Sequence, residues 1–289
     1  MLILPFTSEF MERALIGGSL VAVICAIAGT WVVIRGMAFL GEAIGHGMLP
    51  GVALATVLGL PVMLGAAASA VVMTGLLGAM QRKGKLSYDT SIGLVFVGML
   101  SLGIIIVSHS RSFATDATSM LFGDILAINT ADLWLLAGAL LLSVAIAVKF
   151  HRAFVASAFD TRIALTLGFK PGLAQIMLVL LVALSITASF RSVGTLLVVG
   201  MLLAPVVAAK VWVARIPAIM ILAAVFGVLS VSGGLLISWY AQTAAGPSIS
   251  CLAISLAGIS ALIQKLLSTH KCMPETTHNK SLLHVESAT

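Results

Sequence analysis

The sequence predicts an all-α, polytopic membrane protein. Of its 289 residues, 60% are hydrophobic and only 9% are charged, and the mean hydropathy is +1.17. Soluble domains carry about 25% charged residues, so most of the exterior of this chain must face lipid. The apolar residues form long blocks without the period-2 alternation of an outer-membrane barrel, which predicts helical spans. A cytosolic enzyme, a secreted disulfide scaffold and a disordered chain are excluded.

We expect about nine transmembrane helices, because a helix needs about 20 apolar residues to cross a hydrocarbon layer of ~30 Å. The candidate blocks are 14–34, 41–60, 62–80, 91–108, 131–149, 172–190, 194–214, 217–239 and 247–266. The first block is too long for a cleavable signal peptide, and Arg35 and Gly36 follow it in place of a cleavage site. The blocks predict a transmembrane domain over 1–267, and the polar residues 268–289 predict a disordered cytoplasmic tail.

The basic residues predict the orientation of the chain. If the amino terminus lies outside, only Arg13, Arg111 and Arg191 of the 16 Lys and Arg residues remain on the outer side. Cytoplasmic loops carry an excess of Lys and Arg, so this topology is favoured. The net charge of +6 does not indicate nucleic acid, because the basic residues are scattered singly between apolar blocks. Membrane lipid is therefore an expected partner and nucleic acid is not.

One carboxylate, Glu42, lies well inside an apolar block, in the segment RGMAFLGEAIGHGMLPGVALA. A buried charge is costly, and an ionisable residue within the bilayer indicates a function. His46 follows four residues later, and helix positions i and i+4 share one face about 6 Å apart. A carboxylate beside an imidazole suits a divalent transition metal, so Glu42 and His46 form a candidate metal site.

The residues alone leave three interpretations of this pair open. In a transient metal site, water, the His46 carbonyl or the same pair in another subunit must complete the coordination shell. The pair also suits a neutral hydrogen-bonded couple that packs two helices. A proton relay is the third interpretation, because histidine titrates near neutral pH.

Two prolines interrupt expected spans and are candidate kinks in a transport pathway. Pro50 removes the helical hydrogen bond to the His46 carbonyl, and Pro205 removes the bond to the Met201 carbonyl. Transporters place ion sites at such broken helices. For Pro205, a kink that serves only packing is the alternative.

Residues 150–171 form a polar segment that we expect on the cytoplasmic side. Asp160 is suited to cap a short amphipathic helix, which Gly168 would end. Such a helix between two spans is either a docking element or a helix on the lipid surface. The pattern alone does not decide between these roles.

An ATP site is missing from the sequence. The nearest approach to a phosphate-binding loop, Gly84-Lys85, has Ala79 at the first glycine position and Leu86 after the lysine. A serine nucleophile elbow and an HExxH pair are also absent. We therefore expect no enzymatic activity, and any ATP must be hydrolysed by another chain.

Three segments are specific enough to compare with a known family: GTWVVIRGMAFLGEAIGHGMLPGVALA (29–55), SAFDTRIALTLGF (157–169) and VGTLLVVGMLLAPVVAAK (193–210). They resemble the membrane-permease subunits of ATP-binding-cassette (ABC) importers that take up zinc, manganese or iron(II). The resemblance runs from about Phe10 to Leu266. In that family the acidic residue four before the histidine is usually Asp, so Glu42 keeps the charge on an arm longer by one methylene.

The resemblance implies a fold like that of a type II ABC importer permease, in the inner membrane of a bacterium. It implies a second permease copy, a cytoplasmic ATPase that binds the ATP, and a periplasmic or lipid-anchored metal-binding protein. Glu42 and His46 would form a metal site in the pathway, and the inner segment would be the coupling helix that docks on the ATPase. The coupling residues implied are Phe159, Asp160, Arg162, Leu167 and Gly168.

The expected function is thus ATP-driven import of a divalent transition metal, which is cargo and not a resident cofactor. Zinc is the first choice, and manganese and iron(II) remain open because the two ligands accept all three metals. The alternative is a secondary transporter that couples transport to protons through Glu42 and His46. A structural membrane anchor is a third possibility.

Overall fold

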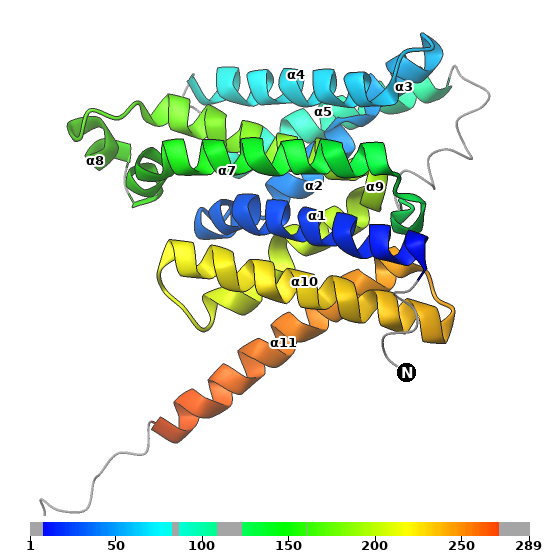
Figure 1. Cartoon of the computed structure of the whole chain (residues 1–289). Coiled ribbons are helices and arrows are strands. Elements are labelled where there is room, and N and C mark those ends of the chain that lie inside the picture. Colours follow the sequence, from blue (N-terminus) through cyan, green and yellow to red (C-terminus); the bar gives the residue numbers. More distant parts are fainter. Residues whose placement is uncertain (1–7, 83–86, 109–122, 160, 272–289) are drawn as a thin grey trace, which may run out of the picture.

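The computed structural model describes residues 8–82, 87–108, 123–159 and 161–271, and these form helices without any strand (Figure 1). The helices are α1 (Glu9–Ile34), α2 (Phe39–Gly47), α3 (Leu49–Val57), α4 (Val62–Arg82), α5 (Tyr88–Ser108), η2 (Ile125–Ala127), α7 (Thr130–Phe159), α8 (Thr161–Thr166), α9 (Pro171–Lys210), α10 (Ile216–Ala241) and α11 (Ala245–Lys271). Within the described ranges, eight helical stretches are long and apolar enough to cross a membrane. The prediction of an all-α, polytopic membrane protein is confirmed.

The block 41–60 does not form the single span that we expected. It is divided into α2 and α3, two helices of nine residues each that meet at Met48. Pro50 lies in the first turn of α3, where its missing N–H costs no helical hydrogen bond, so it begins a helix and does not kink one. The other eight blocks each correspond to one of the eight membrane-spanning stretches.

Helix α9 contains two spans, Pro171–Phe190 and Ser192–Lys210, which we call its first and second arms. The chain turns near the start of the second arm, at Gly194, whose φ of +73° is rarely adopted by residues with a side chain. Gly123, which lies before η2, packs directly on the backbone of this turn: a Cβ added to Gly123 would lie 2.2 Å from the Gly194 nitrogen.

The core of the bundle lies around α1 and the second arm of α9, in each of which 72% of the most apolar stretch is buried. α1 packs against α7, α9 and α10 (Figure 1). In α4, α5, α7 and α11 the buried share is only 22% to 33%, so these helices form the periphery and expose apolar side chains to lipid or to a partner.

One end of the bundle carries basic residues, and we call it the basic end (left in Figure 1). Arg35 follows α1, Lys170 precedes α9, and Lys210 and Arg215 flank the connection from α9 to α10. The assignment of this end to the cytoplasm remains a prediction. α11 continues to Lys271, beyond the predicted end of the transmembrane domain at residue 267, and residues 272–289 of the predicted tail lie outside the described residues.

We expect the contact between α3 and α4 to tolerate no side chain at Gly51. A Cβ at this position would lie 2.0 Å from the Gly65 carbonyl oxygen, so Gly51→Ala must push two helices apart. Such overpacking costs about 1–3 kcal/mol. Thermal unfolding of the detergent-solubilised protein should show a lower Tm for Gly51→Ala than for the wild type.

Gly93→Ala is the matched control, because a Cβ on Gly93 of α5 has no neighbouring atom within 4 Å among the described residues. The control should unfold at the wild-type temperature or slightly above it. Equal Tm values for the two variants would contradict the close contact between α3 and α4.

Candidate functional site

Glu42 and His46 lie on the same face of α2, and the His46 Nε2 and Glu42 Oε1 atoms are 2.9 Å apart. Six other residues of α2, three of them glycines, are buried in the bundle. The His46 side chain is 25% exposed and the Glu42 side chain is 44% exposed on the single chain. The two groups are therefore hydrogen-bonded to each other and reachable from outside the chain.

The spacing of these two atoms is close to that of two ligands on one ion. Metal–ligand bonds of about 2.0–2.2 Å, at angles between a right angle and the tetrahedral value, place neighbouring ligand atoms about 3–3.5 Å apart. The pair can therefore accept a cation after a shift of a few tenths of an ångström. Within the ranges that the structure describes, no group of three or more His, Cys, Asp and Glu residues could hold a metal, so further ligands must come from elsewhere.

Phenylalanine rings form a wall beside the pair. The Phe96 ring of α5 meets the His46 ring edge-on, with centroids 6.1 Å apart and planes at 64°. Phe39 packs on the same Phe96 ring, with centroids 5.4 Å apart. This wall restricts the orientation of the imidazole and excludes water from one side of it. Phe96 was not a candidate in the sequence, because it is 50 residues from His46 and no local pattern links the two.

The joint between α2 and α3 is held by hydrogen bonds from two other helices. The Ser69 hydroxyl on α4 donates to the Gly47 carbonyl at 3.0 Å. The Thr187 hydroxyl on α9 donates to the Met48 sulfur at 3.2 Å. Pro50 offers no N–H to the His46 carbonyl, as its position in the sequence requires. The helix break is therefore a stable feature that follows directly after His46.

The second arm of α9, which contains the buried Pro205, packs along the inner face of α2. A Cβ on Gly41 would lie 2.8 Å from Leu202, and one on Gly45 would lie 3.5 Å from Thr195. The Leu202 carbonyl also packs on Gly29 of α1: a Cβ added to Gly29 would lie only 1.9 Å from the Leu202 carbonyl oxygen. The fold thus brings together two of the three segments singled out in the sequence, 29–55 and 193–210, with the pair Glu42 and His46 about 100° around α2 from the glycines that contact α9.

The third segment forms the short helix α8 at the basic end (Figure 1). Gly168, with φ of +78°, ends it in a Schellman motif: its N–H donates to the Leu165 carbonyl, and the Phe169 N–H donates to the Ala164 carbonyl. Leu165 and Leu167 are 59% and 61% exposed. An apolar surface therefore faces outward beside the last turn of α8.

Three of the residues implied for coupling are described incompletely or not at all. Asp160 lies outside the described residues, so its predicted role as a cap stays a prediction. For Phe159 and Arg162 the structure describes the backbone alone, in α7 and α8 respectively.

The chain matches a family model and several characterised relatives. The family model, ABC 3 transport family, matches residues 7–264. The manganese transport system membrane protein MntC of Halalkalibacterium halodurans is 34% identical over 248 residues, which cover 86% of this chain and 85% of that protein. The chelated iron transport system membrane protein YfeD of Yersinia pestis is 33% identical over 251 residues, covering 85% and 82%.

Solved structures share the fold. PsaBC from Streptococcus pneumoniae, in complex with Fab, contains a chain that superposes with a TM-score of 0.80 at 30% identity, covering 93% of this chain and 98% of that chain. An inward-facing metal-chelate type ABC transporter has a TM-score of 0.71 at 13% identity, covering 87% and 85%, and shows similarity of fold alone. The family match over residues 7–264, together with these relatives, shows that the chain belongs to the ABC 3 transport family, as a membrane permease subunit.

Proposed function

We propose that this chain is the permease of an importer that moves a divalent transition metal across the inner membrane of a bacterium, with energy from ATP bound to a separate subunit. The observation that carries the proposal is the pair Glu42 and His46, with its ligand atoms 2.9 Å apart on an accessible face of α2. The carboxylate and the imidazole act as transient ligands of the cargo. Family membership supports the transport role, and the pair supports the choice of a metal.

Manganese is the cargo we propose first, and iron(II) second. Relatives of 30% to 34% identity are named as manganese transport proteins, and a relative of 33% identity is named for chelated iron. Carboxylate oxygen is a hard ligand that suits manganese, and imidazole suits iron. Zinc, which the ligands alone made our first choice, has no such support among these relatives.

A second copy of the permease would complete the metal site. The two ligands of one chain lie on an outward face, and a two-fold axis beside α2 would place a second Glu42 and a second His46 opposite the first pair. The ion would then have four protein ligands, and water would occupy the remaining positions. A cargo site must also release its ion. A coordination shell that is shared between two chains can open when the chains move apart, and it therefore suits transport better than a rigid site within one chain.

Helix α8 is the element that we propose to dock on the ATPase. Its exposed Leu165 and the neighbouring Leu167 supply an apolar contact, and both lie at the basic end, which we place in the cytoplasm. The metal-binding protein would deliver cargo at the opposite end. The chain itself then needs no catalytic residue.

We expect Glu42→Gln and His46→Ala each to reduce uptake of radiolabelled manganese in cells to background, because each removes one of two ligands on the chain. The amount of ATPase that co-purifies with the permease should stay at the wild-type level. Glu9→Gln is a matched control, because the Glu9 side chain is 79% exposed and pairs with Arg13 at the start of α1. Normal uptake by Glu42→Gln would refute the metal site and favour a purely structural pair.

Reconstitution distinguishes an ATP-driven importer from a proton-coupled transporter. The hydrogen bond between Glu42 and His46 is compatible with proton coupling as well. Liposomes that contain the permease, its ATPase and the binding protein should accumulate manganese only with ATP. Permease alone under an imposed pH gradient should transport nothing. Uptake in that second arm would replace the proposal with proton coupling.

For the coupling helix, we expect Leu167→Glu to reduce ATPase co-purification about tenfold or more, because an apolar contact of this size is worth about 1.5–3 kcal/mol. Scrambling 159–168 should have a larger effect. Ala214→Glu, an exposed position in the connection between α9 and α10 at the same end, should not change co-purification. Wild-type binding by the scrambled variant would remove the coupling assignment.

A further inference from the structure

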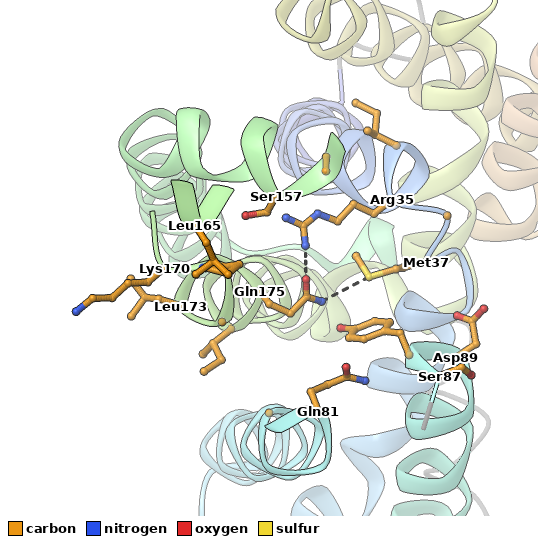
Figure 2. A pocket seen from close by; sticks show the side chains of 18 residues that line it. Arg35, Met37, Gln81, Ser87, Asp89, Ser157, Leu165, Lys170, Leu173 and Gln175 are labelled. Carbon is orange, nitrogen blue, oxygen red and sulfur yellow. Dashed lines mark hydrogen bonds between the residues drawn. The ribbon is translucent and has the colours of Figure 1, made fainter. Parts of the chain in front are cut away.

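A large cavity opens at the basic end, between the ends of α1, α4, α5, α7 and α9. Its volume is about 1010 Å³. Figure 2 shows Arg35 and Gln175 pointing toward each other near its centre, with Gln81 on the opposite wall. Tyr88 also lines the cavity. None of these four residues was a candidate in the sequence, because they come from four separate helices or their ends.

The cavity wall holds several hydrogen-bond donors that have no partner among the described residues. Arg35 donates to the Gln175 side-chain oxygen and, at 3.5 Å, to the Phe154 carbonyl. Buried polar atoms with no hydrogen-bond partner among the described residues are the Arg35 Nε, the Gln81 Nε2 and the Ser157 Oγ. The Tyr88 hydroxyl lies beside Gln175 and Arg35 without a hydrogen bond of normal geometry. Each of these groups has an N–H or O–H to offer, and burying one unpaired costs about 1–3 kcal/mol.

The charge of Arg35 has no acidic partner in the described part of the chain. Among the described residues Arg35 forms no ion pair, and burial lowers the pKa of its guanidinium below the ordinary value. Lys170 adds a second cation at the rim, where its side chain extends outward (Figure 2). Asp89 is the one acidic residue of the described lining, and it lies on the side of the cavity away from Lys170 (Figure 2). The part of the cavity around Arg35 therefore favours an anion with several acceptor oxygens.

An apolar groove continues from this cavity along the membrane-facing side of α4 and the first arm of α9. Its volume is about 350 Å³, and it shares Gly78 and Ile176 with the cavity. Gly75 keeps the groove open, because a Cβ there would have no neighbouring atom within 4 Å in the described part of the chain. The groove reaches Val71, which lies roughly 15 Å from Gln81 along the helix axis. That distance equals the hydrocarbon depth of one leaflet, about half of ~30 Å.

We propose that the cavity and the groove together bind one anionic phospholipid from the leaflet at the basic end. The phosphate accepts hydrogen bonds from the Arg35 cluster, and one acyl chain lies along Gly75 and Gly78. A basic pocket between transmembrane helices, with an apolar groove leading from it into the leaflet, matches the two parts of such a lipid. The site is separate from Glu42 and His46, so the proposal does not depend on the metal.

Native mass spectrometry of the full-length protein, purified with a mixture of phosphatidylglycerol and phosphatidylethanolamine, tests the proposal. The wild type should retain one phosphatidylglycerol per chain. Gly75→Leu should lose it, because the new side chain fills the groove. Gly138→Leu is the matched control: Gly138, on α7, also has no atom within 4 Å of an added Cβ among the described residues, and the lipid should remain.

The charge is tested separately. Arg35→Gln should lower the preference for phosphatidylglycerol over phosphatidylethanolamine about fivefold, the effect of one basic residue near a lipid phosphate. Arg215→Gln, at the same end but outside the cavity, should leave the preference unchanged.

Three results would overturn the proposal. The first is that the wild-type protein retains no lipid, which would be the result if a second protein chain covered the groove. The second is equal retention by Gly75→Leu and the wild type, which remains decisive even if Arg35→Gln fails to fold. The third is binding of inorganic phosphate that depends on Arg35 but not on Gly75, because the cavity would then be a site for a free anion.

Discussion

The absence of water in the hydrocarbon layer is the constraint on which this structure depends, because every polar group there needs a partner within the protein. The joint of α2 and α3 meets this constraint. At the joint of α2 and α3, the Gly47 carbonyl accepts from the Ser69 hydroxyl, and the Met48 sulfur accepts from the Thr187 hydroxyl. The Glu42 carboxylate faces the His46 ring. An irregular segment that carries ionisable groups can therefore persist within an apolar bundle.

Glycine and other small residues decide how this segment is held. Gly41 and Gly45 let the second arm of α9 approach the inner face of α2, and Gly51 lets α3 touch the α4 backbone at Gly65. In lipid, such close approach replaces the hydrophobic effect as the source of helix association. One side of α2 is thus fixed by packing, while the side with Glu42 and His46 stays accessible for a cation or a second chain.

The start of α2 lies between the cavity at the basic end and the pair Glu42 and His46. Arg35 and Met37 line the cavity at the basic end, and Glu42 follows little more than one helical turn after Met37. The hydrogen bond from Arg35 to Gln175 connects this point to the start of α9, which directly follows α8. The predicted coupling helix, the cavity and the pair Glu42 and His46 therefore lie along one short series of contacts through Arg35.

The sequence by itself determined the helical membrane fold, the eight continuous spans and the shared face of Glu42 and His46, because these follow from local hydropathy and from the helical repeat. It also placed the end of helix α8 at Gly168, whose backbone conformation favours glycine. Only the tertiary structure decided that 41–60 is two helices, that Phe96 stands beside His46, and that Arg35 meets Gln175 and Tyr88 in a cavity. These features depend on contacts between helices that are far apart in the chain. No local pattern specifies which apolar helix faces pack against one another and which face lipid.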